Sequence, residues 1–338
     1  MPNVRIATPR ARRQAIAASV LLACVLFAGG CKTSDDAAAA ATQLTATSKS
    51  LTDYYSALDT ILAETDQLNA VQVVLYGIPY DDGTKAQIAD TRAEIQKRAA
   101  LAKGLTELAQ NFAKLTGSTA STDASASAAK LETEVESLKL TKSKMSSNEQ
   151  SLMKVAIGLV VSAIQEHKKR EAAQGIDKFT AALNDFFTKE APDYISLNDD
   201  YRAISSSLAK SLLQNDQTDP SSFFTAALGP YGLTPEVTDS KLRKEIEKLA
   251  EAQVDQKSAA LEKSQQDATD SMEKSLKQIA DRIDLVANDK PMEVRTVPVN
   301  LADVEKWASQ FATSTASTAT AAAAKTTTTP AKTATKAK

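Results

Sequence analysis

The pattern of apolar residues along the chain predicts long amphipathic helices. From about residue 36 to 75, large apolar side chains recur on two heptad tracks three positions apart, which together form one stripe along a helix face. The stretch 85–116 repeats this pattern, and two glycines and a proline within 76–83 indicate a chain reversal between the two. We therefore expect an antiparallel helical hairpin. The tracks are Leu44, Leu51 and Leu58; Tyr54, Ile61, Leu68 and Leu75; and then Ile88 with Ile95, Leu101 with Leu108 and Leu115, and Leu105 with Phe112.

Residues 152–164 form the most apolar stretch beyond the amino terminus. A shorter helix bearing Leu131, Val135 and Leu138 is expected before it, and capping side chains lie at 147–150. Thirteen residues are too few to cross about 30 Å of hydrocarbon as a helix, and Lys154 interrupts them. We expect a helix buried among others, and insertion of this segment into a membrane is the alternative.

Proline divides the next apolar pattern. Helical faces over 176–187 and 194–212 flank Pro192, so we expect two helices or one kinked helix. The segment 215–238 holds three prolines and is expected to be mostly irregular, and small residues at 117–123 indicate a flexible link.

The last third of the chain predicts one very long helix, a short helix and a tail. The periodic run 239–288 would reach roughly 75 Å as a single helix. Its centre, 252–271, carries few large apolar residues, which suggests exposure, a bend or a partner there. Residues 300–303 resemble a capped helix start, followed by Val304, Trp307 and Phe311. From 312 onward only Ala, Thr, Ser, Lys and one Pro occur, so we expect a disordered tail of charge +4 over 312–338.

Composition favours the same fold class. The chain of 338 residues has only ten glycines and ten prolines, and the prolines leave the runs 80–191 and 236–290 uninterrupted. Many short strands do not fit such runs. We predict an all-α protein: an elongated antiparallel bundle of six to eight long amphipathic helices, coiled-coil-like, over residues 31–311.

The amino terminus has the pattern of an export signal. Four arginines without any acidic residue precede the apolar run 15–28, which is shorter than the ~20 residues of a membrane-spanning helix. The run ends in Leu26-Phe27-Ala28-Gly29-Gly30-Cys31. This arrangement resembles the lipobox of bacterial lipoproteins, with Ala28 at a position where Leu is commoner. The resemblance covers about the first 31 residues and none of the bundle.

The lipobox resemblance implies that residues 1–30 are removed and that Cys31 is diacylated as the first mature residue. Leu21-Leu22-Ala23-Cys24 is similar to a second lipobox, but cleavage there would leave an apolar mature terminus. Several acyl chains anchor a protein stably, whereas one binds only marginally. Lys32 stands where an inner-membrane retention signal has Asp, which favours the outer membrane, facing the periplasm, in a two-membrane bacterium.

Charge and residue types exclude several functions. Loss of residues 1–30 changes the net charge from −2 to −6, so nucleic acid is not an expected partner. One His and two Cys rule out Cys/His zinc sites, and no phosphate-binding, dinucleotide or hydrolase motif is present. His167 lies in a charged run and is interpreted as a surface residue. Acidic pairs at Asp81-Asp82 and at Asp216 and Asp219 are interpreted as turn formers rather than calcium ligands. We expect no enzyme activity, cofactor or metal.

These observations predict a lipid-anchored scaffold or interaction protein of the cell envelope. Its expected contacts are the membrane through Cys31, a protein partner or a second copy through the helices, and weak contacts of the basic tail with anionic cell-wall polymers. The alternative is a membrane-active helical protein that inserts residues 152–164.

Overall fold

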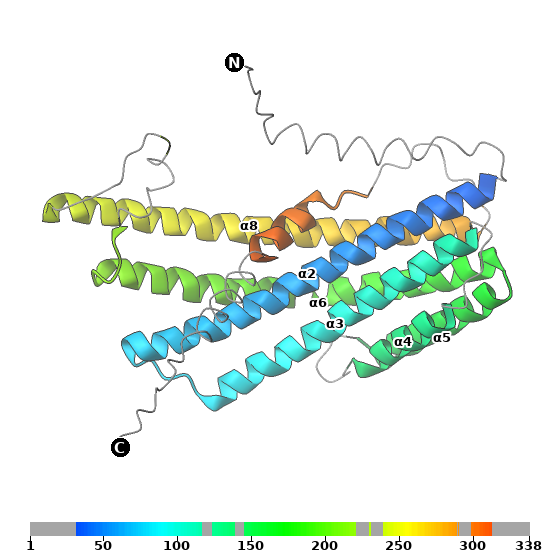
Figure 1. Ribbon diagram of the computed structural model, residues 1–338, viewed down its shortest axis with the longest axis horizontal. Helices are drawn as coiled ribbons and strands as arrows, with labels where there is room; N and C mark the ends of the chain where they lie inside the picture. The colour runs from blue at the N-terminus through cyan, green and yellow to red at the C-terminus, as the bar shows by residue number, and fades with distance from the viewer. Residues whose placement is uncertain are drawn as a thin grey trace, which may run out of the picture.

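The computed structural model describes residues 32–116, 124–138, 145–220, 230, 239–288, 290 and 299–312. These residues form seven helices and no strand, packed as an antiparallel bundle (Figure 1). The all-α prediction is confirmed. Cys31, the link at 117–123 and the tail from 313 onward lie outside the described residues, as does nearly all of 221–238. The helices are α2 (Lys32–Tyr76), α3 (Asp82–Thr116), α4 (Ala124–Ser137), α5 (Ser147–Gln165), α6 (Lys169–Gln214), α8 (Ser240–Ala287) and a short helix at 302–312.

Helices α2 and α3 form the predicted hairpin. Their apolar tracks are buried from Leu44 to Ile61 in α2 and from Ile95 to Leu115 in α3. Gly77 has φ +65° and its N–H donates to the Val73 carbonyl at 3.0 Å, a left-handed cap that glycine adopts without steric cost. The last predicted member of the stripe in α2, Leu75, is 40% exposed, so the stripe continues beyond the core.

Helix α5 packs closely on α6 at Gly175. A β-carbon at Gly175 would lie 2.6 Å from Val160 Cγ2 and 2.9 Å from the carbonyl oxygen of Ala156. The start of α5 is fixed by a capping box, in which Ser146 and Glu149 bond each other's backbone N–H groups. The cap thus begins one residue before the predicted 147–150.

The expectation that 152–164 is buried among other helices holds for only one side of α5. Met153, Ala156, Ile157 and Val160 are buried, but Leu152, Val155 and Leu159 are 46%, 57% and 39% exposed. Helix α5 packs mainly against α4 and α6, which leave the side of Leu152, Val155 and Leu159 exposed. None of the described helices is long and apolar enough to cross a membrane.

Pro192 does not divide the chain into two helices, contrary to one of the two expectations. Helix α6 runs without interruption through Pro192, whose ring is exposed. Glu190, Ala191 and Tyr194 are buried on either side of it. Packing of these flanking turns offsets the roughly 3 kcal/mol that an internal proline costs a helix.

Helix α8 is the predicted long helix, and its two halves have different surroundings. Asp239 caps its start by accepting the backbone N–H groups of Lys241 and Leu242. The second half of α8 contributes Met272, Leu276, Ile279 and Ile283 to the main core. The centre, 252–271, is mostly exposed, and exposure was one of the three explanations suggested for its few large apolar residues. The 302–312 helix packs on the bundle through Trp307, whose ring centroid lies 4.8 Å from that of Tyr54.

The bundle has two unlike ends (Figure 1). At the proximal end, where α2 begins, α4 and α5 lie against the long helices. At the other end the α2–α3 and α6–α8 hairpins project as two distal tips. Leu213, Ala250 and Val254 form a small apolar cluster at the α6–α8 tip, separate from the main core. Val74 and Ile78 on one tip and Leu242 and Leu249 on the other are exposed apolar residues.

Candidate functional site

A buried ion pair joins the two long hairpins. Arg98 of α3 donates from Nε to Glu190 Oε2 at 2.6 Å and from Nη2 to Glu190 Oε1 at 2.7 Å, and both residues are 3% exposed. Nη1 of Arg98 donates to the backbone carbonyl of Glu94 at 2.7 Å. The planar guanidinium matches a carboxylate in this two-point arrangement. The geometry therefore fixes α3 and α6 in one register.

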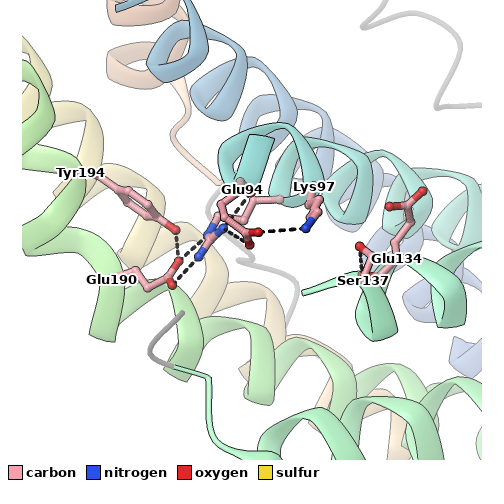
Figure 2. Close-up of polar contacts among 7 residues, drawn as sticks. Glu94, Lys97, Glu134, Ser137, Glu190 and Tyr194 are labelled. Carbon is pink, nitrogen blue, oxygen red and sulfur yellow. Dashed lines mark hydrogen bonds and ion pairs between the residues drawn. The ribbon is translucent and has the colours of Figure 1, made fainter. Parts of the chain in front are cut away.

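Tyr194 and Glu94 extend the pair into a network. Figure 2 shows Glu190 and Tyr194 on α6 beside Glu94 and Lys97 on α3, with the Tyr194 hydroxyl donating to Glu190. The Glu94 carboxylate accepts from Lys97 Nζ at 2.8 Å through Oε1, and its Oε2 lies 3.6 Å from Arg98 Nη1. The network thus pairs two carboxylates, Glu94 and Glu190, with two cations, Lys97 and Arg98.

Aromatic rings enclose the network. The Arg98 guanidinium lies over the Phe186 ring, and Tyr55, Phe187 and Tyr194 pack edge to face or tilted against one another. Burial raises the pKa of the Tyr55 and Tyr194 hydroxyls above the ordinary value, so both stay protonated. Burial alone would lower the pKa of Arg98, but its hydrogen bonds to Glu190 raise that pKa, so Arg98 stays charged. Tyr55, Tyr194 and Arg98 therefore keep their protons near neutral pH.

A cavity of about 540 Å³ lies over the network, between α3 and α6. Glu94, Arg98, Glu190 and Tyr194 form its buried floor, and the carboxylates of Asp90 and Asp193 lie on its exposed rim. Its α3 wall spans Gly83 to Arg98 at intervals of three and four residues, which is one face of the helix.

A second cavity of about 330 Å³ continues the first toward the distal tips. The two share Gln87, Thr91 and Leu197 in their linings, and the second adds residues of α2. Besides the shared Gln87 and Thr91, its polar groups are the side chains of Thr65, Asn69, Thr84 and Asp200. We refer to the two cavities together as the α3–α6 groove.

The histidine and acidic residues singled out from sequence do not line this groove, although Asp81 bonds Thr84, which does. His167 is exposed, in a turn with φ +58°. Asp81 caps α3 by accepting the Thr84 N–H and hydroxyl, which lowers its pKa, and Asp216, just after α6, pairs with Arg243 of α8. No group of three or more His, Cys, Asp or Glu in the described part of the chain is placed to hold a metal ion.

Sequence reasoning missed Arg98 and Glu190, although a signal for both exists. Arg98 lies seven residues before Leu105 and fourteen before Phe112, on the same heptad track. Glu190 lies on the track of Ile176 and Leu183. A charged residue at a position that its track predicts to be buried indicates a buried partner of opposite charge.

No protein-family model matches the chain, and comparison with curated proteins and with solved structures gave no match.

Proposed function

We propose that this protein is a lipid-anchored, non-catalytic scaffold or interaction protein of the cell envelope. The observation that carries the proposal is the lipobox-like sequence ending at Cys31, directly followed by α2, which begins at Lys32. A lipid on Cys31 would be joined to a long rigid helix with no spacer. In a two-membrane bacterium the anchor would lie in the outer membrane, facing the periplasm.

The proposed anchor and the distal tips would lie far apart. Helix α2 has 45 residues and is therefore roughly 68 Å long. Its first residue is at the proximal end, and its last is at the tip that exposes Val74 and Ile78. Exposed apolar side chains gathered at one place are typical of interaction surfaces. A protein partner or a second copy of the chain is the expected contact there.

The charge of the chain supports the same function. The mature chain would carry −6, which disfavours nucleic acid. The basic tail, 312–338, is proposed to make weak contacts with anionic cell-wall polymers, and nearly all of it lies outside the described residues.

One observation favours the alternative, a membrane-active protein that inserts 152–164. Leu152, Val155 and Leu159 form an exposed apolar stripe on α5. A stripe of this kind can lie in a membrane interface. Insertion would also have to separate the close contact of α5 with Gly175 of α6.

Fractionation of cells that express the full chain tests the anchor. With a labelled fatty acid, wild-type protein should carry label and sediment with membranes, whereas Cys31→Ser should lose both. Cys24→Ser is the matched control, because it removes the other cysteine of the signal and leaves the proposed lipid site. If the label persists in Cys31→Ser and is lost in Cys24→Ser, the lipid is attached to Cys24 and our assignment of Cys31 is wrong.

Two further measurements separate the two functions. A photo-crosslinker at Val74 should capture discrete envelope proteins or a second copy, and one at the exposed Asp185 should not. If the protein is a scaffold, the chain without residues 1–30 should release no dye from dye-loaded liposomes. Dye release that Val155→Asp abolishes would instead support the membrane-active alternative.

A further inference from the structure

The two distal tips form one end face of the bundle. The Tyr76 hydroxyl at the end of α2 donates to Gln217 Oε1 at 3.4 Å, and Arg243 of α8 pairs with the neighbouring Asp216, so the two hairpins end side by side. Such a concentration of exposed apolar side chains at one end is typical of an interaction surface. Seven of the ten large apolar residues that are exposed in the described part of the chain lie here: Val71, Val73, Val74, Leu75, Ile78, Leu242 and Leu249.

The first turns of α8 carry an apolar seam with the spacing of a coiled coil. Leu242, Ile246 and Leu249 are four and three residues apart, which places them on one face of the helix. Leu242 and Leu249 are 53% and 57% exposed. A neighbouring face of α8 holds Ala250 and Val254, which belong to the small apolar cluster of this tip. The seam is thus left exposed after α8 has packed on its own bundle, and its spacing fits a second helix.

The charges beside the seam complement each other in an antiparallel pair of identical helices. Glu245 and Lys248 lie on the solvent flank of the seam, with side chains 66% and 70% exposed, and pair with each other at 3.0 Å. A two-fold axis across an antiparallel pair brings this flank of one helix against the same flank of the other in reverse order. Glu245 of each copy then lies near Lys248 of the other copy. Exposed ion pairs contribute little, so exchanging the intramolecular pairs for intermolecular ones costs little.

The end face is large enough for a second copy. Residues 71–82 and 240–250 together supply about the 20–30 residues that one partner of a stable interface uses. In a two-fold assembly both copies use the same surface, so the seven exposed apolar side chains of each copy are covered together. From the seam, its charges and its extent we infer that two copies of this chain join tip to tip, with the first turns of α8 paired antiparallel across a two-fold axis.

This inference rests on the proposed interaction role of the distal tips and names their partner. In such a dimer the two proximal ends face away from each other. Helix α2 of each copy has 45 residues, so the two proposed lipid sites would lie on the order of 100 Å apart. Failure of self-association would leave the anchor and a different protein partner standing. Failure of the fractionation experiment would leave the dimer standing, because self-association is measured without membranes.

Sedimentation equilibrium of the chain without residues 1–30 and with Cys31→Ser tests the inference, since this chain keeps every residue that the structure describes. It should form dimers reversibly and no larger species. Leu249→Asp should weaken dimerisation by about tenfold or more, because it places a carboxylate in the seam. Leu152→Asp is the matched control: Leu152 is 46% exposed on α5, and its variant should dimerise as the parent chain does. Circular dichroism shows that each variant is folded before it is measured.

Charge reversal tests the antiparallel pairing. Glu245→Lys and Lys248→Glu should each weaken self-association, because like charges then face each other across the two-fold axis. An equimolar mixture of the two variants should recover the dimer, since each residue 245 then faces an opposite charge at residue 248 of the other chain. Mixing would not repair a loss of structure in either variant.

Three results would each overturn the inference. The first is a chain that stays monomeric up to about 0.1 mM, where a Kd in the micromolar range gives dimers. The second is equal loss of dimerisation in Leu152→Asp and Leu249→Asp, and the third is a mixture of the charge variants that is no more dimeric than its components. If the chain stays monomeric and the crosslinker at Val74 captures another envelope protein, that protein is the partner of the tips instead.

Discussion

Arg98 and Glu190 lie 92 positions apart in the chain, and their side chains meet in a two-point ion pair that is excluded from solvent. Few other contacts connect α3 directly with α6. Removing two charges from water is expensive, and their attraction repays this only with good geometry and additional hydrogen bonds. The third bond of Arg98 to the Glu94 carbonyl and the bond of Tyr194 to Glu190 supply them.

Breaking this pair from one side should be far more harmful than removing it altogether. Glu190→Leu removes the two-point partner of the buried Arg98 and leaves it only the Glu94 carboxylate at 3.6 Å, so it should lower the free energy of unfolding by roughly 3 kcal/mol. The double variant Arg98→Met with Glu190→Leu should recover most of that loss. Urea unfolding measures both. The control is Arg92→Met, which breaks the more exposed pair with Asp59 and should cost less than about 1 kcal/mol. Equal costs for Arg92→Met and Glu190→Leu would show that burial does not govern the pair.

The close approach of α5 and α6 gives a second prediction. Gly175→Ala should destabilise the protein by about 1–3 kcal/mol, because the added methyl meets Val160 Cγ2 at 2.6 Å and backbone atoms of α5 near 3 Å. Gly158→Ala is the control on the facing helix. A β-carbon there meets no atom within 4 Å, so the better helix propensity of Ala should stabilise the protein by up to about 1 kcal/mol. Thermal melts that move in the same direction for both variants would contradict the packing described for Gly175.

Two adjacent residues of α5 differ sharply in burial. Leu159 is 39% exposed and Val160 is fully buried. Leu159→Asp should therefore cost less than about 1 kcal/mol, whereas Val160→Asp places an unpaired carboxylate in the core and should cost several kcal/mol. Chemical unfolding of the two variants compares the same new residue at successive sites. A large loss with Leu159→Asp would mean that its side of α5 is covered in the folded protein.

Local periodicity predicted the helices, but not the contacts between them. The tracks through Leu51 and Leu58 and through Leu105 and Phe112 lie at fixed spacing, so the hairpin could be read from sequence. The pairing of Arg98 with Glu190 depends on which helices become neighbours, and periodicity carries no such information. Burial of α5 was overestimated for the same reason: Leu152 and Val155 are as apolar as Met153 and Ile157, and only the number of neighbouring helices makes their exposure different. At Pro192 the local rule was overridden by tertiary packing on both sides.

Asp177 of α6 is expected to make stability fall as pH rises. Burial raises its pKa above the ordinary value, and repulsion by Asp284 and Asp281 raises it further, while Lys178 opposes the shift. Because the folded-state pKa is the higher one, the folded protein holds more protons between the unfolded value near 3.9 and the folded value. Raising the pH through this window therefore removes stability, and at pH 7 the ionised carboxylate is a net cost.

Asp177→Asn should raise the free energy of unfolding at pH 7, and this advantage should vanish below about pH 4. Asp185→Asn controls for the removal of one negative charge from the same helix. Urea unfolding of the three proteins from pH 3.5 to about 7.5 gives the comparison, and a gain for Asp177→Asn that stays constant over that range would show that titration of Asp177 is not its cause.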